Sequence, residues 1–523
     1  MNARGMMGRG RIMKQQPVVA PRIIIIVMSI ACLYATAWLI VRANRLVDVP
    51  YGCDDFGYLR QAKLFVEHGF ILGLDTSMND PAAKLVVELS KNSGIPAKEW
   101  YQGVGPHAHH YKVLTDKIID QYPPGTGFFM SFFPEGQRNK GWLLLAGGLV
   151  IGFAWTVSVV ARGEIMAASL AAVCGAVILP ILVRIGSSIP VTTGLSVVLC
   201  FLLGVMLTKD LLPWAHPVLA LACGLVFGAL VDVRLPNALI FPGILLCLCS
   251  RRQRMVLSLA AFGLGAAAAL TPLGWANIIN AGGLLHATYS SIDASSPVFN
   301  LAQITKAARF YMLKSEARFL LPLALFCIAL SWRRSRIAAY AGLIVIASEI
   351  AYFFTHEVLT TYYLLPGLYF AIFLCLISIA PSSRRWLFGG LGSAIFALCV
   401  SLLVVQFSST HLPFQLPGPG QAAELKKGVV WAEVSGGLFG YYLDIDTPKI
   451  RWTPKELQYS LIEKVRKKGM RQFFVDDCPD MDASIKEYAA RFPIVPAGKL
   501  FGKDVYRLEP AGNHGQNLET SLR

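Results

Sequence analysis

Eleven apolar segments alternate with polar segments along this chain. The first apolar segment runs from Ile23 to about Val41, and ten more centre near residues 151, 174, 199, 222, 243, 265, 325, 346, 370 and 397. Most are long enough to cross the roughly 30 Å hydrocarbon core of a bilayer, whereas 236–250 and 319–332 are short for it. The pattern predicts a polytopic α-helical membrane protein with about eleven transmembrane helices.

Three polar stretches are long enough to fold outside the bilayer: 44–140, 276–318 and the tail from about residue 409. The first begins with an amphipathic helix that should run to about Gly69. The tail follows a Pro/Gly-rich linker and alternates strand and helix patterns, with strands expected at 429–434, 471–475 and 503–508 and helices at 454–468 and 483–491. We therefore expect a transmembrane domain over 1–408 and a small α/β domain over 409–523.

The start of the predicted helix at 454–468 carries a capping signature. Thr453 precedes Pro454, and Glu456 follows three residues after the threonine. A Thr side chain at the N-cap and a Glu at the third helical position would satisfy two backbone N–H groups reciprocally. We therefore expect Thr453 to be the N-cap.

Composition supports the membrane class. Hydrophobic residues make up 54% of the chain, charged residues make up 15%, and the mean hydropathy is +0.52. Soluble domains carry about 25% charged residues. Nine of the 11 cysteines fall in apolar segments; Cys53 and Cys478 do not, and the sequence leaves open a bridge between them.

Basic residues predict the orientation of the chain. Residues 1–22 contain five basic residues and no acid, and the connections near 162, 209, 251–254, 333–336 and 384–385 are also basic. Basic connections stay in the cytoplasm, which places the N-terminus inside and the three long polar stretches outside. These residues account for much of the +16 net charge, so no nucleic-acid partner is implied. We expect a bacterial inner membrane with a periplasmic tail, because no organelle address appears.

Asp54 and Asp55 are the candidate catalytic residues. Both lie at the expected start of the helix after the first span. One interpretation is structural, because carboxylates at a helix N-terminus are stabilised by unpaired N–H groups and the helix dipole. The other is a sugar ligand or a general base, which must be ionised and within about 3 Å of the hydroxyl that it deprotonates.

Five basic residues on the expected outer side could contact a phosphate. Arg234 is there against the orienting rule, either to bind an anion or to pair with Asp232. The other four follow a plausible outer helix and would contact either a phosphate or acidic lipid headgroups: Lys306, Arg309, Lys314 and Arg318.

Cofactor signals are weak. His107, His109 and His110 leave a divalent metal open, although histidines in a polar loop are more often solvated. The glycine-rich 436–440 lacks the spacing of a phosphate loop, which argues against nucleotide binding. No cofactor is therefore assigned.

Five short stretches, in this order, resemble the GT-C superfamily of membrane glycosyltransferases, in particular the aminoarabinose and protein O-mannosyl transferases. They are the Asp54-Asp55 dyad followed by Tyr58, the Tyr122-Pro-Pro-Gly125 stretch, 231–237 around Arg234, 277–289 ending in Tyr289, and 361–366 with Tyr362. An α/β tail is also similar. The resemblance spans most of the chain, although each motif is short.

The resemblance implies transfer of a sugar from a polyprenyl-phosphate donor to a lipid, glycan or protein hydroxyl at the outer membrane face, with inversion. Asp54 would be the general base and Asp55 the second candidate, because relatives usually carry Asp-Glu here. The cationic residues would receive the departing phosphate. The substrate cavity would contain Tyr58, Tyr122, Tyr289 and Tyr362, with Glu357 near a late span.

Two other functions remain open. A transporter or flippase for a lipid-linked or anionic substrate would place its acids and arginines along a path at bilayer depth, although no repeated halves are visible. A scaffold of the same fold without activity is the second. Turnover and donor binding of an Asp54→Asn variant would separate these cases.

Overall fold

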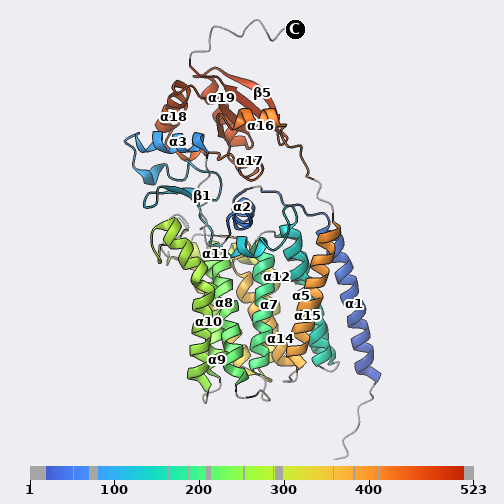
Figure 1. Ribbon diagram of the computed structural model, residues 1–523. Helices are drawn as coiled ribbons and strands as arrows, with labels where there is room; N and C mark the ends of the chain where they lie inside the picture. The colour runs from blue at the N-terminus through green and yellow to red at the C-terminus, as the bar shows by residue number, and fades with distance from the viewer. Residues whose placement is uncertain are drawn as a thin grey trace, which may run out of the picture.

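The computed structural model describes residues 19–50, 52–69, 80–161, 164–185, 188–207, 212, 214–250, 254–286, 288, 299–356, 359–380, 385–408 and 412–511. A bundle of apolar helices forms one end of the molecule, and a mixed α/β domain forms the other (Figure 1). The bundle contains α1 (Val19–Ala43), α5 (Arg138–Val160), α6 (Ile165–Arg184), α7 (Ser188–Met206), α8 (Ala215–Val233), η2 (Leu235–Ile240), α9 (Phe241–Cys249), α10 (Met255–Ala276), α12 (Ala317–Ser331), α13 (Arg336–Thr355), α14 (Leu365–Ile379) and α15 (Arg385–Phe407).

These helices confirm the eleven apolar segments expected from the sequence. Eight are long and apolar enough to cross a membrane, and three are shorter: η2 with α9 over Leu235–Cys249, α12 and α14. Two of the short ones are the segments whose length was already marginal in the sequence. The chain is therefore a multi-pass membrane protein.

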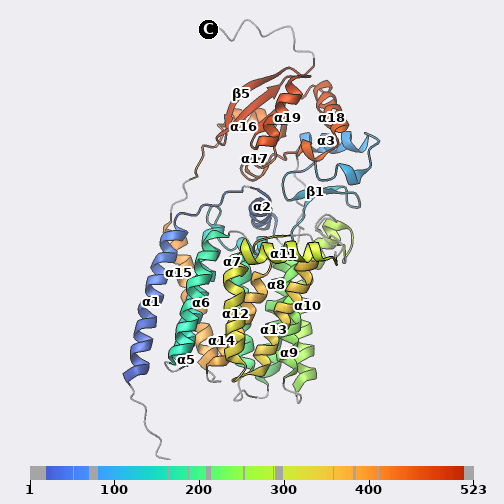
Figure 2. The same cartoon turned by 180° about the vertical axis from the view of Figure 1, so that it is seen from behind.

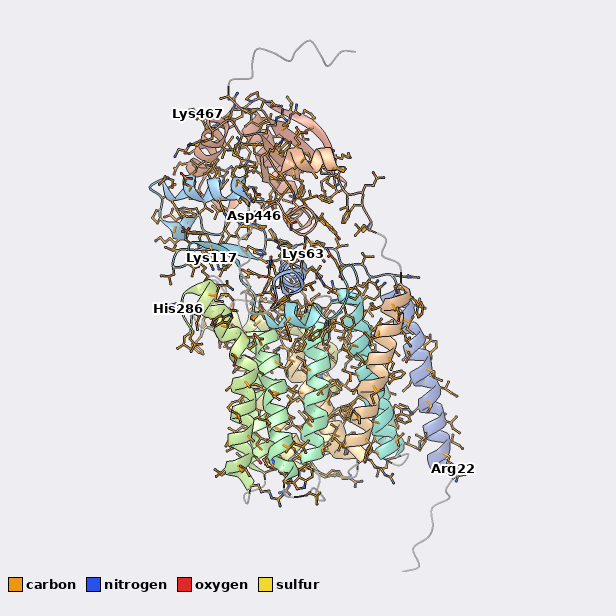
Figure 3. The ribbon with its side chains drawn as sticks, in the orientation of Figure 1. Arg22, Lys63, Lys117, His286, Asp446 and Lys467 are labelled. Atoms are coloured by element: carbon orange, nitrogen blue, oxygen red, sulfur yellow. The ribbon has the colours of Figure 1, made fainter. Side chains whose placement is uncertain are left out.

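Because successive spanning helices run in opposite directions, the connections between them lie alternately at the two ends of the bundle. The described basic residues Arg254, Arg333, Arg334, Arg336 and Arg385 lie at helix ends on the side where α1 begins. Figure 3 shows Arg22 at that same end and the α/β domain at the other. With this distribution, the positive-inside rule would place the basic end of the bundle in the cytoplasm and the α/β domain outside. That orientation stays a prediction.

Small residues allow a close helix contact in the bundle, between α8 and α10. A Cβ atom on Gly224 would lie 2.1 Å from the carbonyl oxygen of Phe262, and one on Gly265 would lie 2.2 Å from that of Leu221. In lipid, where hydrophobic burial between helices contributes little, such close backbone packing is a main source of helix association.

A set of short elements lies between the bundle and the C-terminal domain (Figure 1). It contains α2 (Gly52–His68), α3 (Pro81–Lys91), η1 (Ala97–Glu99), the antiparallel hairpin of β1 (His109–Lys112) and β2 (Lys117–Asp120), α4 (Gly125–Met130), η4 (Asn277–Ala281) and α11 (Leu301–Leu313). Of these, α3 packs against α18 (Lys455–Lys467) of the C-terminal domain and not on the bundle. In Figure 2, α11 lies across the top of the bundle, as an interfacial helix would.

The C-terminal domain is a four-stranded sheet with helices. The strand order is β3-β4-β6-β5, in which β3 and β4 are parallel and the other neighbours are antiparallel. Its elements are α16 (Pro419–Leu425), β3 (Val429–Trp431), α17 (Gly436–Leu443), η5 (Ile450–Trp452), α18 (Lys455–Lys467), β4 (Gln472–Asp476), α19 (Pro479–Ala489), β5 (Ile494–Leu500) and β6 (Lys503–Leu508). The predicted α/β tail is confirmed.

Several details of the tail differ from the sequence expectations. The helices α16 and α17 were not expected, and the strand expected at 429–434 ends at Trp431. Thr453 is not the N-cap of α18: Pro454 occupies that position, and the Thr453 hydroxyl instead donates to the carbonyl of Ile450 at 2.7 Å. Helix α19 begins at Pro479, four residues earlier than expected, because proline suits the first helical turn. Strand β5 was missed, since it is an exposed edge strand interrupted by Pro496 and Gly498.

The cysteines and the tail core also bear on the expectations. Cys53 and Cys478 are both free, so the bridge that the sequence left open is not formed. The core of the tail includes residues from the first outer segment, because Val86 and Trp100 pack in one buried cluster with Leu461 and Phe474. The tail is thus fixed onto the segment that carries Asp54.

Asp48 anchors the first outer segment to the bundle. Its carboxylate accepts from the backbone N–H groups of Arg138 at 2.7 Å and Asn139 at 2.9 Å, at the start of α5. Burial raises the pKa of Asp48 to about 6, and the two backbone hydrogen bonds oppose that shift. A carboxyl with a raised folded-state pKa favours the folded state below the unfolded pKa and loses that contribution as the pH rises.

We predict that wild type gains about 1 kcal/mol of unfolding free energy relative to Asp48→Asn when the pH falls from 7 to 5. The reason is that Asp48 takes up its proton near pH 6 in the folded state but only near pH 4 when unfolded. Chemical unfolding of both proteins in detergent at the two pH values measures it. A difference that stays constant or shrinks would contradict the buried position.

Candidate functional site

Asp54 lies in the first turn of α2, between the helical bundle and the C-terminal domain. Both oxygens of its carboxylate accept hydrogen bonds from tyrosine hydroxyls. Tyr122 Oη donates to Oδ1 at 2.5 Å, and Tyr362 Oη donates to Oδ2 at 2.5 Å. The side chain is half-buried, so it combines a fixed orientation with access from outside.

The position of Tyr122 is set by its neighbours on α2 and β2. Its backbone N–H donates to Asp120 Oδ1 at 2.9 Å, and Gln61 Nε2 donates to its carbonyl at 2.9 Å. The ring packs where Gly57 has no side chain, because a Cβ there would lie 2.7 Å from the ring. Tyr58 stacks behind it, with ring centroids 4.6 Å apart.

Tyr362 connects Asp54 to Arg234. The guanidinium of Arg234 lies over the Tyr362 ring at 4.5 Å and over the Tyr363 ring at 5.0 Å. Burial raises the pKa of Tyr362 above its usual value, so the hydroxyl stays a donor to Asp54 at neutral pH. Tyr362 therefore contacts a carboxylate through its hydroxyl and a guanidinium through the face of its ring.

Arg234 is placed by the end of α8. The helix stops there with an extended backbone, two residues before Pro236, and Arg234 Nη1 donates to Ser188 Oγ at 3.2 Å. Only 5% of the residue is exposed. Asp232, its suggested partner, has its Oδ1 oxygen buried with no hydrogen-bond partner among the described residues.

The basic residues of α11 lie apart from this pair. Lys306, Arg309 and Lys314 line a cavity of about 650 Å³, together with Leu301, Ala302, Thr305, Phe310 and Leu359. Arg318 is not part of that lining: it lies over the ring of Phe319 at 4.6 Å and donates to the carbonyl of Leu313 at 2.6 Å. Of these four basic residues that were expected to contact a phosphate, three therefore line one cavity and the fourth does not.

The structure brings together four of the residues expected from the sequence: Asp54, Tyr122, Tyr362 and Arg234. Asp55 follows Asp54 on α2, about 100° around the helix, so its side chain leaves in a different direction. Tyr58 is fully buried behind Tyr122, so it supports the site from the second layer. Tyr289 and Glu357 lie outside the described residues.

Sequence reasoning missed two contributors to the site. Ser188, at the start of α7, and Tyr363, beside Tyr362, both contact Arg234. The paired tyrosines were a visible signal for Tyr363. Nothing in the sequence near Ser188 indicated its contact with a residue 46 positions away.

The three histidines do not form a metal centre with other residues of the described chain. No group of three or more His, Cys, Asp or Glu side chains that could hold a metal is present among the described residues. Burial lowers the pKa of His107 to about 4 and those of His109 and His110 to about 3, so all three are neutral at pH 7.

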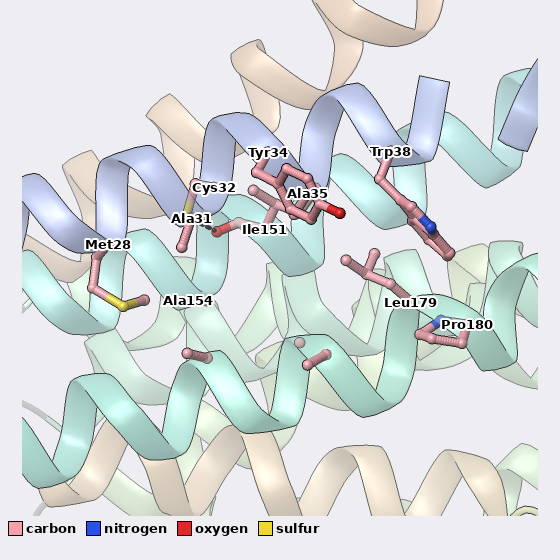
Figure 4. Close-up of a pocket in the computed structure, with 13 residues that line it drawn as sticks. Met28, Ala31, Cys32, Tyr34, Ala35, Trp38, Ile151, Ala154, Leu179 and Pro180 are labelled. Atoms are coloured by element: carbon pink, nitrogen blue, oxygen red, sulfur yellow. Dashed lines mark hydrogen bonds between the residues drawn. The ribbon is translucent and has the colours of Figure 1, made fainter. Parts of the chain in front are cut away.

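A further cavity, of about 390 Å³, lies among α1, α5 and α6 (Figure 4). Its lining is almost entirely apolar, with Met28, Trp38, Ile151 and Leu179 among its side chains. No carboxylate, histidine or cationic side chain lines it. Such a lining suits a hydrocarbon chain and supplies no group for acid–base catalysis or anion binding, so this cavity is not a candidate active site.

Two solved structures are similar to this chain. The structure of ArnT from Cupriavidus metallidurans in the apo state has a TM-score of 0.46 and 13% identity, and ArnT from the same organism bound to undecaprenyl phosphate has a TM-score of 0.42 and 14% identity. Each similarity covers 85% of this chain and 97% of the other. No family model and no curated protein sequence matches the chain. Because both TM-scores lie below 0.5, the chemistry of this chain rests on its own side chains.

We predict an energetic coupling of about 1 kcal/mol or more between Arg234 and Tyr362, because the contact is buried and desolvated. A double-mutant cycle of Arg234→Gln and Tyr362→Leu, with unfolding free energies measured in detergent, gives this value. Tyr362→Phe keeps the ring and should keep most of the coupling.

The pair of Arg318 and Phe319 is the matched control, since its geometry is similar but both side chains are exposed on the surface of the protein. Its cycle should give a smaller coupling. Equal values for the two pairs would contradict the buried contact.

Proposed function

We propose that this protein transfers a sugar from a polyprenyl-phosphate donor to a hydroxyl acceptor at the outer face of the membrane. Asp54 takes the proton from the acceptor hydroxyl, whose oxygen attacks the anomeric carbon. The bond from that carbon to the phosphate oxygen breaks, and polyprenyl phosphate leaves. A single displacement of this kind inverts the anomeric configuration.

The contact chain from Asp54 through Tyr362 to Arg234 carries the proposal. The reaction needs a base on one side of the anomeric carbon and a cation on the other, where negative charge grows on the leaving phosphate. An arginine suits that role, because its planar guanidinium can bind two phosphate oxygens at once. Asp54 and Arg234 are separated by one tyrosine ring.

Their position at the end of the bundle supports a lipid-linked donor. Asp54 is on the interfacial helix α2, and Arg234 ends the spanning helix α8. The isoprenoid tail of such a donor must stay in lipid while its phosphate reaches the membrane boundary. The cavity beside Lys306, Arg309 and Lys314 would attract the phosphate on its way to Arg234.

The transporter alternative is less well supported by this arrangement. A transport path would distribute its charged groups at bilayer depth. In the described residues, Asp54, Arg234 and the basic side chains of α11 all lie at the end of the bundle that faces the C-terminal domain. We therefore favour the transferase.

We predict that Asp54→Asn lowers turnover by about 10²- to 10⁴-fold, the usual contribution of a general base. The amide keeps the shape of the side chain but cannot take a proton, so retention of radiolabelled polyprenyl phosphate should be unchanged. Turnover is measured by mass spectrometry of lipids and surface glycans. Cells with wild type and cells with the variant are compared for one sugar that is present in the first and missing in the second.

Asp55→Asn is the matched control for that variant. It should cost less, because Asp54 is the carboxylate that the two tyrosines hold. Full turnover by Asp54→Asn would overturn the proposed mechanism, and a larger loss in Asp55→Asn would transfer the role of base to Asp55.

We also predict that charge removal on α11 weakens donor binding in a salt-dependent way. A Lys306→Gln and Arg309→Gln double variant should bind polyprenyl phosphate several-fold more weakly at low salt, and the difference should shrink as salt rises. Arg318→Gln, outside the cavity, is the control and should bind like wild type. Equal losses in both would indicate a general effect of surface charge.

A further inference from the structure

A second cluster of polar side chains is buried between α2 and the C-terminal domain. Its centre is the segment that follows α17, where Asp446 is 1% exposed, Thr447 is fully buried and Lys449 is 6% exposed. Figure 3 shows Asp446 on the side of the domain that faces Lys63 of α2. The mechanism proposed above uses none of these three residues.

Several atoms of this cluster have no hydrogen-bond partner among the described residues. The buried atoms without a partner are both carboxyl oxygens of Asp446, the hydroxyl of Thr447, Nε2 of His109 and Oε1 of Glu433. Burying a polar group without a partner costs free energy, so such atoms normally contact ordered water or a ligand. Five such atoms from three parts of the chain are more than one bridging water would satisfy.

Lys449 lies at the centre of the cluster. Its ammonium is 4.6 Å from the centroid of the Trp452 ring, and no hydrogen bond to it is formed within the described chain. It is close enough to act electrostatically on six groups that come from α2, from β1 and the residues just before it, and from the C-terminal domain: Cys53, His107, His109, His110, Glu433 and Asp446.

The backbone around the cluster is built to bring these groups together. Ala108, between two of the histidines, has a φ of 63°, a conformation that costs a non-glycine residue about 1 kcal/mol or more. A Cβ on Gly436 would lie 2.4 Å from Thr447 Oγ1, and one on Gly437 would lie 2.3 Å from the carbonyl of Pro50.

Ion pairs hold the C-terminal domain against α2. Asp444 Oδ1 lies 3.1 Å from Arg60 Nη1 and 3.2 Å from Lys63 Nζ, and Lys63 also donates to the carbonyl of Tyr441 at 2.9 Å. These ion pairs therefore hold the C-terminal domain against α2 without any contribution from the unsatisfied atoms of the cluster.

The cluster adjoins the candidate active site through Cys53. This residue precedes Asp54, its thiol accepts from Gln121 Nε2 at 3.5 Å, and the charges of both Asp54 and Lys449 act on it. The cluster is thus linked electrostatically to the residue next to the proposed base.

We propose that this cluster binds the hydroxyl groups of a carbohydrate acceptor. The inference rests on the proposed function and names its acceptor class. A sugar hydroxyl donates one hydrogen bond and accepts others, which matches a site that mixes the donors Lys449 and Thr447 with the acceptors Asp446 and Glu433. A hydrocarbon chain would satisfy none of these atoms, and a single inorganic anion would not use the carboxyl oxygens.

The test is the binding of the full chain in lipid nanodiscs to an array of defined glycans. Wild type should be retained on a subset of the glycans, and a Thr447→Val and Lys449→Met double variant should lose at least tenfold of that binding. Lys499→Met, an exposed lysine of the same domain, is the matched control and should bind like wild type.

Retention of radiolabelled polyprenyl phosphate by the double variant shows that it is folded. Binding of no glycan by wild type, or equal binding by the double variant, would overturn the inference and leave a cluster filled by water only. Asp54→Asn separates the two proposals: it should bind the glycans and fail in transfer. Glycan binding without transfer by wild type would defeat the proposed function alone.

Discussion

The hydrogen bonds from Tyr122 and Tyr362 to Asp54 are the interaction on which the site depends. A carboxylate at a membrane boundary has little water to solvate it, so its charge needs fixed donors. The two tyrosines come from the first outer segment and from the loop before α14, and they bind opposite oxygens of the carboxylate. The bundle and the outer layer are therefore joined at the group that is proposed to take the proton. The same contact brings Arg234 within one ring of Asp54, which turns two separate charges into a candidate reaction centre.

The supporting structure can be understood from that requirement. Asp48 fixes the beginning of α5, the absence of a side chain at Gly57 makes room for the Tyr122 ring, and Glu349 accepts from the backbone N–H of Gly367 at 2.8 Å at the start of α14. Each contact limits the motion of an element that carries a site residue. The C-terminal domain adds a second boundary, because its ion pairs with α2 close the side of the site that faces away from the bilayer.

Charge is distributed in the same way. Arginines gather at the end of the bundle where α1 begins, whereas the carboxylates and cations of the candidate site lie at the other end. Under the positive-inside rule, cations at the first end would orient the chain in the membrane without any need for a specific partner. Cations at the second end have specific contacts, as Arg234 does with two aromatic rings and a serine. The surroundings of the cations therefore distinguish the two ends of the bundle better than the number of cations at each end does.

The sequence by itself determined the spanning helices and the α/β tail, because long apolar runs and alternating patterns are local signals that burial enforces. It also singled out Asp54 as a candidate, and its role stays a proposal. It failed at Thr453, where a nearby 3-10 turn competed for the hydroxyl, and at the edge strand β5, whose residues are mostly exposed. Only the tertiary structure decided which distant residues meet: Ser188 with Arg234, Tyr362 with Asp54, and Asp444 with Arg60. Those contacts join positions up to 384 residues apart, Arg60 and Asp444, and no local pattern encodes a contact of that range.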